Sequence, residues 1–317
     1  MAPERGAGGV GRFAIENRPS RPGIRTVVYL LAVSLIWAFS FGLIGNALKG
    51  VDPSFVAAAR LGIALAVFLP FLRRCAVPER ECWKLAGCGA VQFGLMSVCY
   101  IRAYTYLPSH LVALFSVLTP LYVVLLHDLR RRRRAPAHLG AAALSVAGAA
   151  VIRARGGEAD GFWTGFWLMQ LAGAAFAFGQ VFYRDWKRRH PDTPDHSVMG
   201  WLYAGGTAAA LGFAAATADW GTLTVAPAQW MVLLFLGTVA SGLGFFLWNK
   251  GAALSHPATL AACNNLVVPL AVFCSLFVFG EIAEVSGREI GRLLAGGTLI
   301  GASVWVAERT RRRAEAA

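Results

Sequence analysis

The feature that most constrains the fold is a series of ten apolar stretches, each about as long as a bilayer is thick. A helix rises about 1.5 Å per residue, so roughly 20 apolar residues cross the hydrocarbon core. Because lipid offers backbone N–H and C=O groups no hydrogen-bond partner, each stretch has to be helical. The pattern predicts an all-α integral membrane protein with ten transmembrane helices, near residues 26–47, 54–72, 84–105, 108–127, 136–153, 161–183, 197–217, 229–249, 257–280 and 288–306.

The basic residues separate into alternate loops. Of the 30 Lys and Arg residues, 23 lie in the N-terminal segment, the even-numbered loops and the C-terminal tail. The odd-numbered loops hold only Lys49, Arg153, Arg155 and Arg288, while Arg60, Arg102 and Arg292 lie in or near the apolar stretches. Since positive loops are retained in the cytoplasm, the asymmetry predicts a multi-pass protein of the bacterial inner membrane with both termini cytoplasmic.

The net charge of +13 has the same origin. Its charges are divided among short loops that would lie beside anionic lipid, so the bilayer rather than nucleic acid is the predicted partner. The one continuous run, Arg130 to Arg134, lies at the mouth of a span, where it would retain that orientation.

The six cysteines predict neither a disulfide framework nor a metal centre. Cys75 and Cys82 fall in a predicted inside loop, Cys88, Cys99, Cys263 and Cys274 fall in spans, and no Cys-x-x-Cys pairs with histidines. We expect no metal and no cofactor. Residues 1–25 are polar and basic and lack the apolar region of a signal peptide, a transit peptide being the alternative reading.

Three short similarities indicate an internal repeat. The segment Ala38 to Gly42 resembles Ala175 to Gly179; Arg102 precedes Pro120 by 18 residues as Lys250 precedes Pro269 by 19; and residues 138–140 resemble residues 289–291. Each half then holds five spans, and an odd number inverts the second half relative to the first. The predicted domains are a disordered basic N-terminus (1–25), a first five-helix repeat (26–154), a linker (155–160), a second repeat (161–306) and a basic tail (307–317).

With these motifs the chain resembles the drug/metabolite transporter superfamily, and in particular its EamA-type members with ten helices. The resemblance rests on residues 35–41, Pro53 to Leu61, Ala103 to Pro120, residues 241–248, Ala261 to Pro269 and residues 279–281. It implies two inverted five-helix bundles around a central cavity, through which small metabolites move. The Gly280–Glu281 pair of the second half has no counterpart in the first, where residues 126–129 run directly into arginines.

Charged residues within the spans are the first candidates for the site, because burying charge in lipid is costly. Arg60, about two turns into its span, could hold an anionic group such as a carboxylate, or could bond backbone carbonyls of a neighbouring helix. Arg102 and Lys250 occupy repeat-related positions and are predicted gating residues, with interfacial cations as the alternative. Pro120 and Pro269 are predicted hinges, or bends that packing fixes.

Polar and aromatic side chains within the spans complete the predicted substrate site. With Arg60, it comprises Trp37, Tyr100, Tyr104, Gln180, Tyr183, Trp248, Asn264 and Asn265. Adjacent Asn264 and Asn265 cannot both face lipid cheaply, so one could bind cargo while the other bonds a neighbouring helix; helix packing could also explain both. Glycines such as Gly140, Gly148, Gly296 and Gly297 predict close helix packing.

The charge pattern predicts the class of cargo. No Asp or Glu lies in the middle of a span, whereas proton-coupled export of cations generally needs one. We therefore expect an exporter or facilitator of small metabolites by alternating access, with amino acids or related carboxylate-bearing solutes as cargo. The alternatives are a sugar-phosphate or nucleotide-sugar transporter, a proton-coupled drug or cation exporter, and a membrane scaffold that transports nothing.

No enzyme is predicted, because the histidines lie at span ends or in loops and no hydrolase or phosphate-binding motif occurs. One chain already holds both repeats, so a monomer suffices, and a homodimer is the alternative.

Overall fold

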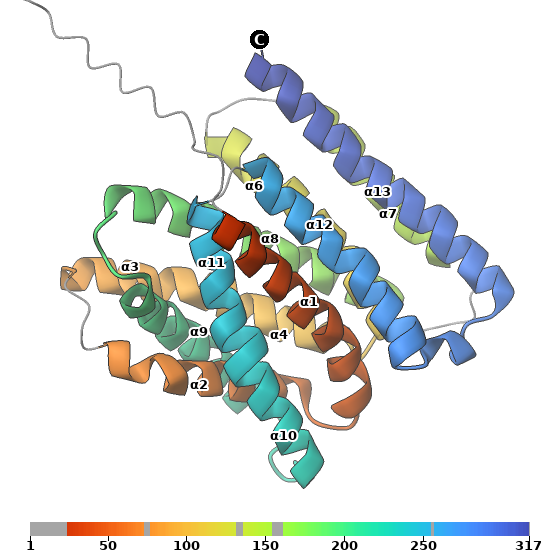
Figure 1. Cartoon of the computed structure of the whole chain (residues 1–317). Helices are drawn as coiled ribbons and strands as arrows, with labels where there is room; N and C mark the ends of the chain where they lie inside the picture. The colour runs from red at the N-terminus through yellow and green to blue at the C-terminus, as the bar shows by residue number, and fades with distance from the viewer. Residues whose placement is uncertain (1–23, 73–76, 131–135, 154–160, 255–256, 317) are drawn as a thin grey trace, which may run out of the picture.

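The computed structural model describes residues 24–72, 77–130, 136–153, 161–254 and 257–316, and this part of the chain forms helices and no strands. The helices make up ten segments joined by short loops (Figure 1). In order, they are α1 (Ile24–Ala47); α2 (Pro53–Leu72); α3 (Glu79–Gly89), η1 (Ala90–Leu95) and α4 (Met96–Ala103); α5 (Ser109–Phe115), η2 (Ser116–Leu118) and α6 (Thr119–Arg130); α7 (Pro136–Arg153); α8 (Phe162–Arg189); α9 (Asp195–Thr217); α10 (Pro227–Phe235), η3 (Leu236–Leu243) and α11 (Gly244–Leu254); α12 (Pro257–Phe273) and η4 (Cys274–Val278); and, after the 3₁₀ turn η5 (Glu281–Glu284), α13 (Gly287–Ala316).

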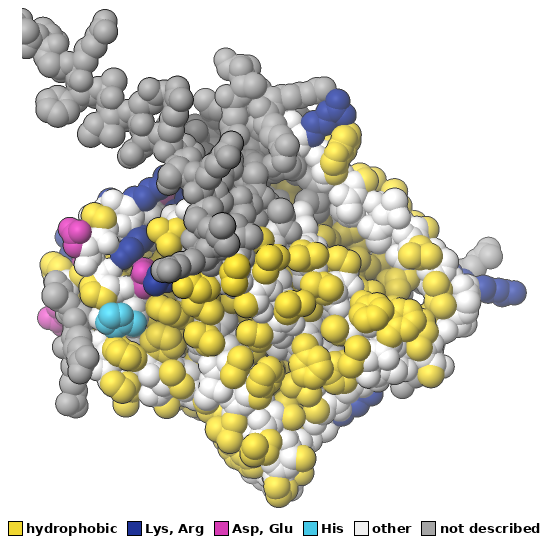
Figure 2. Space-filling view, in the orientation of Figure 1, with side chains coloured by type: hydrophobic (Ala, Val, Ile, Leu, Met, Phe, Trp, Pro, Cys, Tyr) yellow, Lys and Arg dark blue, Asp and Glu magenta, His cyan; other side chains and the backbone are white. Residues whose placement is uncertain are grey.

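These segments confirm the predicted all-helical membrane fold. Six of them are long and apolar enough to cross a bilayer by length and composition, and three further apolar helices are shorter. Figure 2 shows hydrophobic side chains over the middle of one face, with charged side chains toward its margins. Large hydrophobic side chains such as Leu35, Leu266 and Phe277 are exposed on the molecule. So extensive an apolar surface is suited to lipid rather than water.

Some predicted features lie outside the described residues. These are the N-terminal segment up to residue 23, Cys75, Arg131 to Arg134 and the whole of the linker 155–160. At the other terminus, α13 continues to Ala316, ten residues beyond the predicted end of the last span. The added residues are mostly Ala, Arg and Glu, which favour a helix without needing burial.

Helix packing occurs in pairs that correspond between the two halves. The second and seventh segments, α2 and α9, pack on each other, as do the fifth and tenth, α7 and α13 (Figure 1). The contact of α1 with α12 corresponds to that of α8 with α6, and α1 with α11 corresponds to α8 with α4. This symmetry is what two inverted repeats are expected to produce.

Glycines allow the closest of these helix crossings. A Cβ atom on Gly205 of α9 would lie 1.8 Å from the carbonyl oxygen of Ala86 on α3. Across the α7–α13 pair, a Cβ atom on Gly148 would lie 2.7 Å from the carbonyl oxygen of Gly296. The predicted packing role is confirmed at Gly148 and Gly296 and is wrong at Gly140, beside which there is open space.

The odd-numbered loops gather at one end of the molecule, which we call the outer end after the predicted topology. Gln229 Nε2 donates to the carbonyl oxygens of Ala47 and Lys49, at 3.4 Å each. Glu281, before α13, accepts from the backbone N–H of His110 on α5 at 3.2 Å, and its Oε2 lies 2.8 Å from His110 Nδ1. Asn46 Nδ2 on α1 donates to the other carboxylate oxygen at 3.2 Å. Glu281 therefore joins the two halves at this end.

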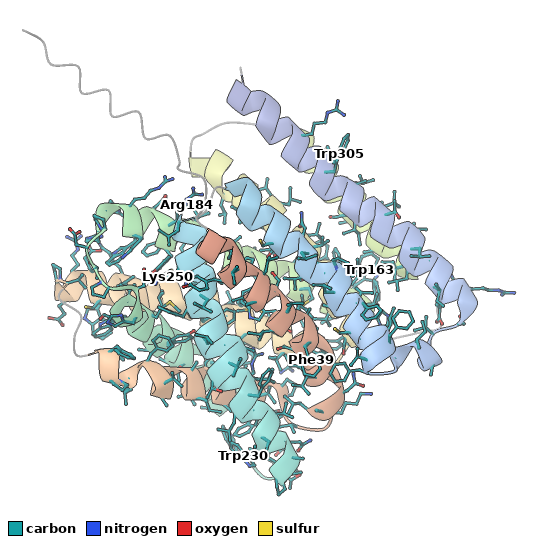
Figure 3. The ribbon with its side chains drawn as sticks, in the orientation of Figure 1. Phe39, Trp163, Arg184, Trp230, Lys250 and Trp305 are labelled. Carbon is teal, nitrogen blue, oxygen red and sulfur yellow. The ribbon has the colours of Figure 1, made fainter. Side chains whose placement is uncertain are left out.

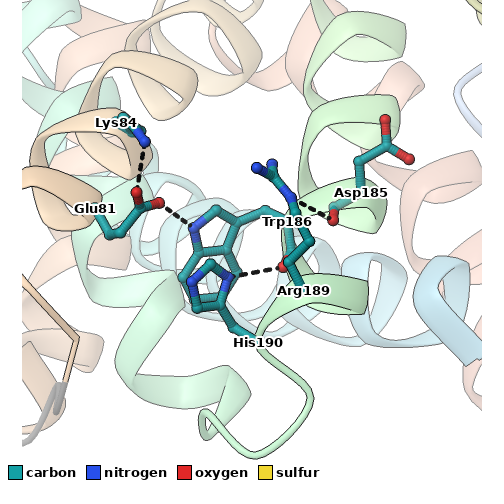
Figure 4. Close-up of polar contacts among 6 residues, drawn as sticks. All are labelled: Glu81, Lys84, Asp185, Trp186, Arg189 and His190. Atoms are coloured by element: carbon teal, nitrogen blue, oxygen red, sulfur yellow. Dashed lines mark hydrogen bonds and ion pairs between the residues drawn. The ribbon is translucent and has the colours of Figure 1, made fainter.

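At the opposite, inner end, Trp186 of α8 joins the third and sixth segments. Its Nε1 donates to Glu81 Oε2 of α3 at 2.9 Å, and its ring stacks on His190 at 4.2 Å between centroids. Glu81 also accepts from Lys84 (Figure 4). The fully buried Trp186 thus donates to the carboxylate of Glu81, which is also paired with Lys84.

Replacing Gly205 with Ala should destabilise the protein, because the new methyl group would meet the backbone of α3. Such overpacking costs about 1–3 kcal/mol. Gly212→Ala, on the same helix with open space beside it, should leave stability unchanged or slightly higher. Thermal unfolding of both variants in detergent tests the crossing. Equal melting temperatures would contradict it.

The contacts of Glu281 predict a dependence of stability on pH. Burial, the largest single influence, raises the pKa of this carboxyl group, but several hydrogen bonds, foremost that with His110, together outweigh burial and hold the pKa below the ordinary value of 4.5. A lowered folded-state pKa stabilises the protein above the ordinary pKa, and this contribution is lost as pH falls through the folded value.

Glu281→Gln should therefore lower the melting temperature at pH 7, and the gap from the wild-type protein should narrow below about pH 4.5. Melting curves of both proteins between pH 3 and 8 provide the measurement, and the exposed Asp192→Asn serves as control. A gap that stays constant over that range would show that the Glu281 contact does not titrate as inferred.

Candidate substrate-binding cavity

A cavity of about 780 Å³, counted to its open mouth, lies among helices of both halves. The lining residues are Trp37, Ser40 and Phe41 of α1; Arg60 of α2; Met96 and Tyr100 of α4; Ser116 of η2 and Thr119 of α6; Met169, Ala172, Gly173 and Phe176 of α8; Ala240 of η3; Phe245 of α11; and Asn264 and Val267 of α12. The wall is mostly apolar, with a few polar groups.

Arg60 is the charged residue of this lining. Its side chain is 5% exposed, and its Nη2 donates to Ser241 Oγ on η3 at 3.0 Å. Nε and Nη1 have no hydrogen-bond partner in the described part of the chain. The guanidinium carbon lies 5.9 Å from the centre of the Tyr100 ring. A buried N–H group without an acceptor is costly. An anionic group in the cavity would therefore be a favourable hydrogen-bond partner for Arg60.

Tyr100 is held in place beside Arg60 by its neighbours. Its hydroxyl lies 2.9 Å from that of Tyr104, one helical turn on, and its ring meets Phe41 edge to face at 5.5 Å. Tyr104 does not line the cavity itself. Its hydroxyl pairs with that of Tyr100 instead.

Trp37 connects the cavity wall to a π-helical turn. Its Nε1 donates to the carbonyl oxygen of Ala240 in η3 at 2.9 Å, while the Tyr203 hydroxyl donates to the next two carbonyl oxygens, of Ser241 and Gly242, at 2.7 and 2.9 Å. A π turn disturbs the regular hydrogen bonding of a helix. Side chains of α1 and α9 therefore supply donors that the helix itself lacks.

An aromatic cluster closes the cavity on the side of Trp37. The Trp37 ring lies 4.9 Å from Trp248, 5.4 Å from Phe245 and 5.9 Å from Phe176. Trp248 is fully buried behind this layer and does not line the cavity. Apolar rings at this position give a ligand a flat surface to pack against.

Asn264 reaches the cavity from α12, on a wall that it shares with Ser116 and Thr119. It makes no hydrogen bond to any residue that the structure describes. Its neighbour Asn265 is absent from the lining, and the Oδ1 atom of Asn265 is buried with no partner among the described residues. The two adjacent amides therefore face different surroundings.

The structure places the other predicted site residues away from the cavity. Gln180 is buried on α8, where its Nε2 has no partner in the described part of the chain. The Tyr183 hydroxyl donates to Asp195 Oδ1 at 2.6 Å at the inner end. Four of the nine predicted substrate-binding residues line the cavity: Trp37, Arg60, Tyr100 and Asn264.

The predicted gating and hinge residues also lie outside the lining. Arg102 ends α4, and Lys250 lies on α11, with its Nζ 5.8 Å from the centre of the Phe246 ring (Figure 3). Pro120 follows the 3₁₀ turn η2, which separates α5 from α6. Pro269 lies inside α12, which continues through it to Phe273.

Sequence reasoning missed several cavity residues and the three π turns of the described residues, η1, η3 and η4. The small hydroxyl residues Ser40, Ser116 and Thr119 carry no periodic or charge signal that would distinguish them from packing residues. The turns η1 and η3 occupy corresponding places in the third and eighth segments. A signal was present there, since Gly94 precedes Arg102 and Gly242 precedes Lys250 by eight residues each.

Comparison with known proteins places this architecture in a family. The EamA-like transporter family matches residues 24–154 and again residues 160–304. A solved crystal structure of a protein with 22% identity has a TM-score of 0.60 over 92% of this chain and 99% of that chain. At this identity the structural likeness bears on the fold alone.

Curated relatives cover nearly the whole chain. A probable biotin transporter of Pseudomonas aeruginosa is 40% identical over 290 residues, 91% of this chain and 99% of that protein. The biotin transporter of Escherichia coli K12 is 36% identical over 294 residues, 90% of this chain and 96% of that protein. A probable terminal-alkyne amino-acid exporter of Streptantibioticus cattleyicolor is 25% identical over 280 residues.

The two family matches and these relatives confirm the resemblance to the drug/metabolite transporter superfamily. They also agree with the apolar helices in indicating a multi-pass protein of the bacterial inner membrane, a transporter of small metabolites and not an enzyme. The chain belongs to the EamA-like transporter family.

Proposed function

We propose that the protein transports biotin or a closely similar solute that carries a carboxylate. The observation that carries this proposal is Arg60, a buried cation at the cavity wall with two nitrogen atoms that no described residue accepts from. A carboxylate is a strong acceptor for a guanidinium group, and a partly desolvated site strengthens the pair. The names of the relatives with 36–40% identity support biotin within this class.

The charge of the lining favours an anion over a zwitterion. No Asp or Glu is among the described residues that line the cavity. The ammonium group of an amino acid would lose water there without gaining a counter-charge, which is costly. The sequence-based preference for amino acids also finds no support in the biotin transporters among the relatives. The broader expectation, a carboxylate-bearing solute, is retained.

The alternatives fit the cavity less well. A sugar phosphate or nucleotide sugar carries more than one negative charge and calls for several converging cations. Arg60 is the basic residue among the described lining, and Lys250 contacts Phe246 instead. A cationic drug would meet Arg60 with like charge. A scaffold that transports nothing predicts no solute flux at all.

The transport is proposed to be facilitated, through alternating access between the two repeats. The corresponding helix pairs of the two halves allow two similar packings around one cavity. With no acidic group in the described lining, flux follows the gradient of the solute. An imposed pH gradient should then leave biotin flux unchanged, and flux that follows protons would contradict this part.

Arg60→Gln should reduce biotin uptake into liposomes by roughly 10- to 100-fold at low substrate concentration. The reason is the loss of charge-assisted hydrogen bonds worth about 1.5–3 kcal/mol. Labelled biotin with purified protein provides the measurement. Arg292→Gln, the same substitution on α13 outside the cavity lining, is the matched control and should transport as the wild type does.

Competition by biotin methyl ester separates charge from shape. The wild-type protein should prefer biotin over the ester, and Arg60→Gln should lose this preference. Uptake by Arg60→Gln equal to the wild type would argue against the carboxylate site. No biotin uptake by the wild-type protein would argue against biotin as cargo.

A further inference from the structure

The hydroxyl groups that line the cavity have already used their protons. Ser40 Oγ donates to the carbonyl oxygen of Ile36 at 2.7 Å, and Ser116 Oγ donates to that of Ala113 at 2.6 Å. Thr119 Oγ1 donates to the carbonyl oxygen of Ser116 at 2.9 Å. A hydroxyl has one proton and two lone pairs, so these groups can offer only acceptor positions to a ligand. Such backbone bonds are common for Ser and Thr inside helices.

Asn264 lies near two of these hydroxyl groups, those of Ser116 and Thr119, and its side-chain amide offers both an acceptor and donors. Its side chain lines the cavity and bonds none of the described residues, so its carbonyl oxygen and its NH2 group are both open to a ligand. Because α12 packs on η2, which carries Ser116 and ends directly before Thr119, Asn264 lies on the side of the cavity that carries these two residues. We call these three residues the amide wall.

Arg60 belongs to a different wall. Its helix, α2, packs on α9, α4 and η3 rather than on α12. The guanidinium group has donors only. The cavity therefore has one cationic pole that can only donate and one neutral wall that mainly accepts. A ligand that satisfies both has an anionic group at one end and uncharged N–H groups at the other.

We infer that the amide wall binds the neutral N–H-bearing end of the cargo, and that its best fit is a cyclic urea. The two N–H groups of such a ring donate to Ser116, Thr119 or the Asn264 carbonyl oxygen, and its own carbonyl accepts from the Asn264 NH2 group. The assignment rests on the proposed function, because biotin carries a ring urea at one end and a carboxylate at the other. Asn264 and Thr119 then select for this ring, while Arg60 selects for charge.

The test uses competition against labelled biotin in liposomes with the full-length protein. The competitors are unlabelled biotin and an analogue in which a CH2 group replaces one ring N–H, which keeps the shape and the carboxylate. The wild-type protein should favour biotin by about tenfold, as expected for one lost hydrogen bond with its acceptor left unpaired. Asn264→Leu and Thr119→Val should bind biotin more weakly and reduce this preference toward onefold.

Two controls match these substitutions. Leu266→Ala changes an exposed side chain on α12, two residues from Asn264. Thr298→Val removes an exposed hydroxyl on α13 that donates to its own helix, as Thr119 does, but lies outside the cavity lining. Both should keep the tenfold preference.

The outcomes separate the two proposals. A wild-type protein that takes up biotin but does not distinguish the CH2 analogue overturns the amide wall and leaves biotin transport standing. The same conclusion follows if Asn264→Leu and Thr119→Val keep the wild-type preference. If Asn264→Leu does not fold, Thr119→Val, which preserves side-chain shape, decides the result. A wild-type protein with no biotin uptake overturns the proposed function and this inference together.

Discussion

The cavity depends on how the protein supplies hydrogen bonds to the π turn in its eighth segment. Inside a bilayer each backbone carbonyl without a partner is costly, so a helix can depart from regular geometry only where side chains compensate. Trp37 and Tyr203 do so at the carbonyl oxygens of Ala240, Ser241 and Gly242. The side chain of Ser241, held in this turn, accepts from Arg60. This π turn thus holds Trp37 in the cavity wall. It also supplies, through Ser241, the one hydrogen bond that Arg60 makes to a described residue.

The two repeats share a scaffold but differ in the side chains that fill it. Tyr100 and Trp248 occupy corresponding places, each two residues before the basic residue that marks its segment. Tyr100 lines the cavity beside Arg60, whereas Trp248 is fully buried behind Trp37. Similarly, η1 and η3 correspond, yet η3 borders the cavity and η1 carries Gln92, whose Nε2 donates to Asn249 Oδ1 at 3.0 Å. The repeated helices enclose a cavity between the two halves. The side chains at corresponding positions differ, so the polar groups of its lining come from only some of these positions.

The polar groups of the cavity are few, and their hydrogen-bonding capacity decides what they can recognise. Arg60 supplies donors, and three hydroxyls with committed protons supply acceptors. The absence of an acidic group among the described lining residues makes a bound cation unfavourable. In the proposed function, these properties, rather than the volume of the cavity, are what favours an anionic solute with N–H groups over zwitterions and cations of similar size.

The sequence by itself determined the ten helical segments, the resemblance of the halves and the position of a cation within a span. The surrounding lipid explains the helices and the conspicuous cation. It requires continuous helices, and it makes a charge within a span energetically costly. The same reasoning named nine substrate-binding residues, and four of them line the cavity. Asn265 is the same residue type as Asn264 and its direct neighbour, and Gln180 carries the same amide group, so no local property distinguishes Asn264 from them. Only the tertiary structure decided which faces of these helices meet, because helix crossing angles and the π turns arise from contacts between segments far apart in the chain.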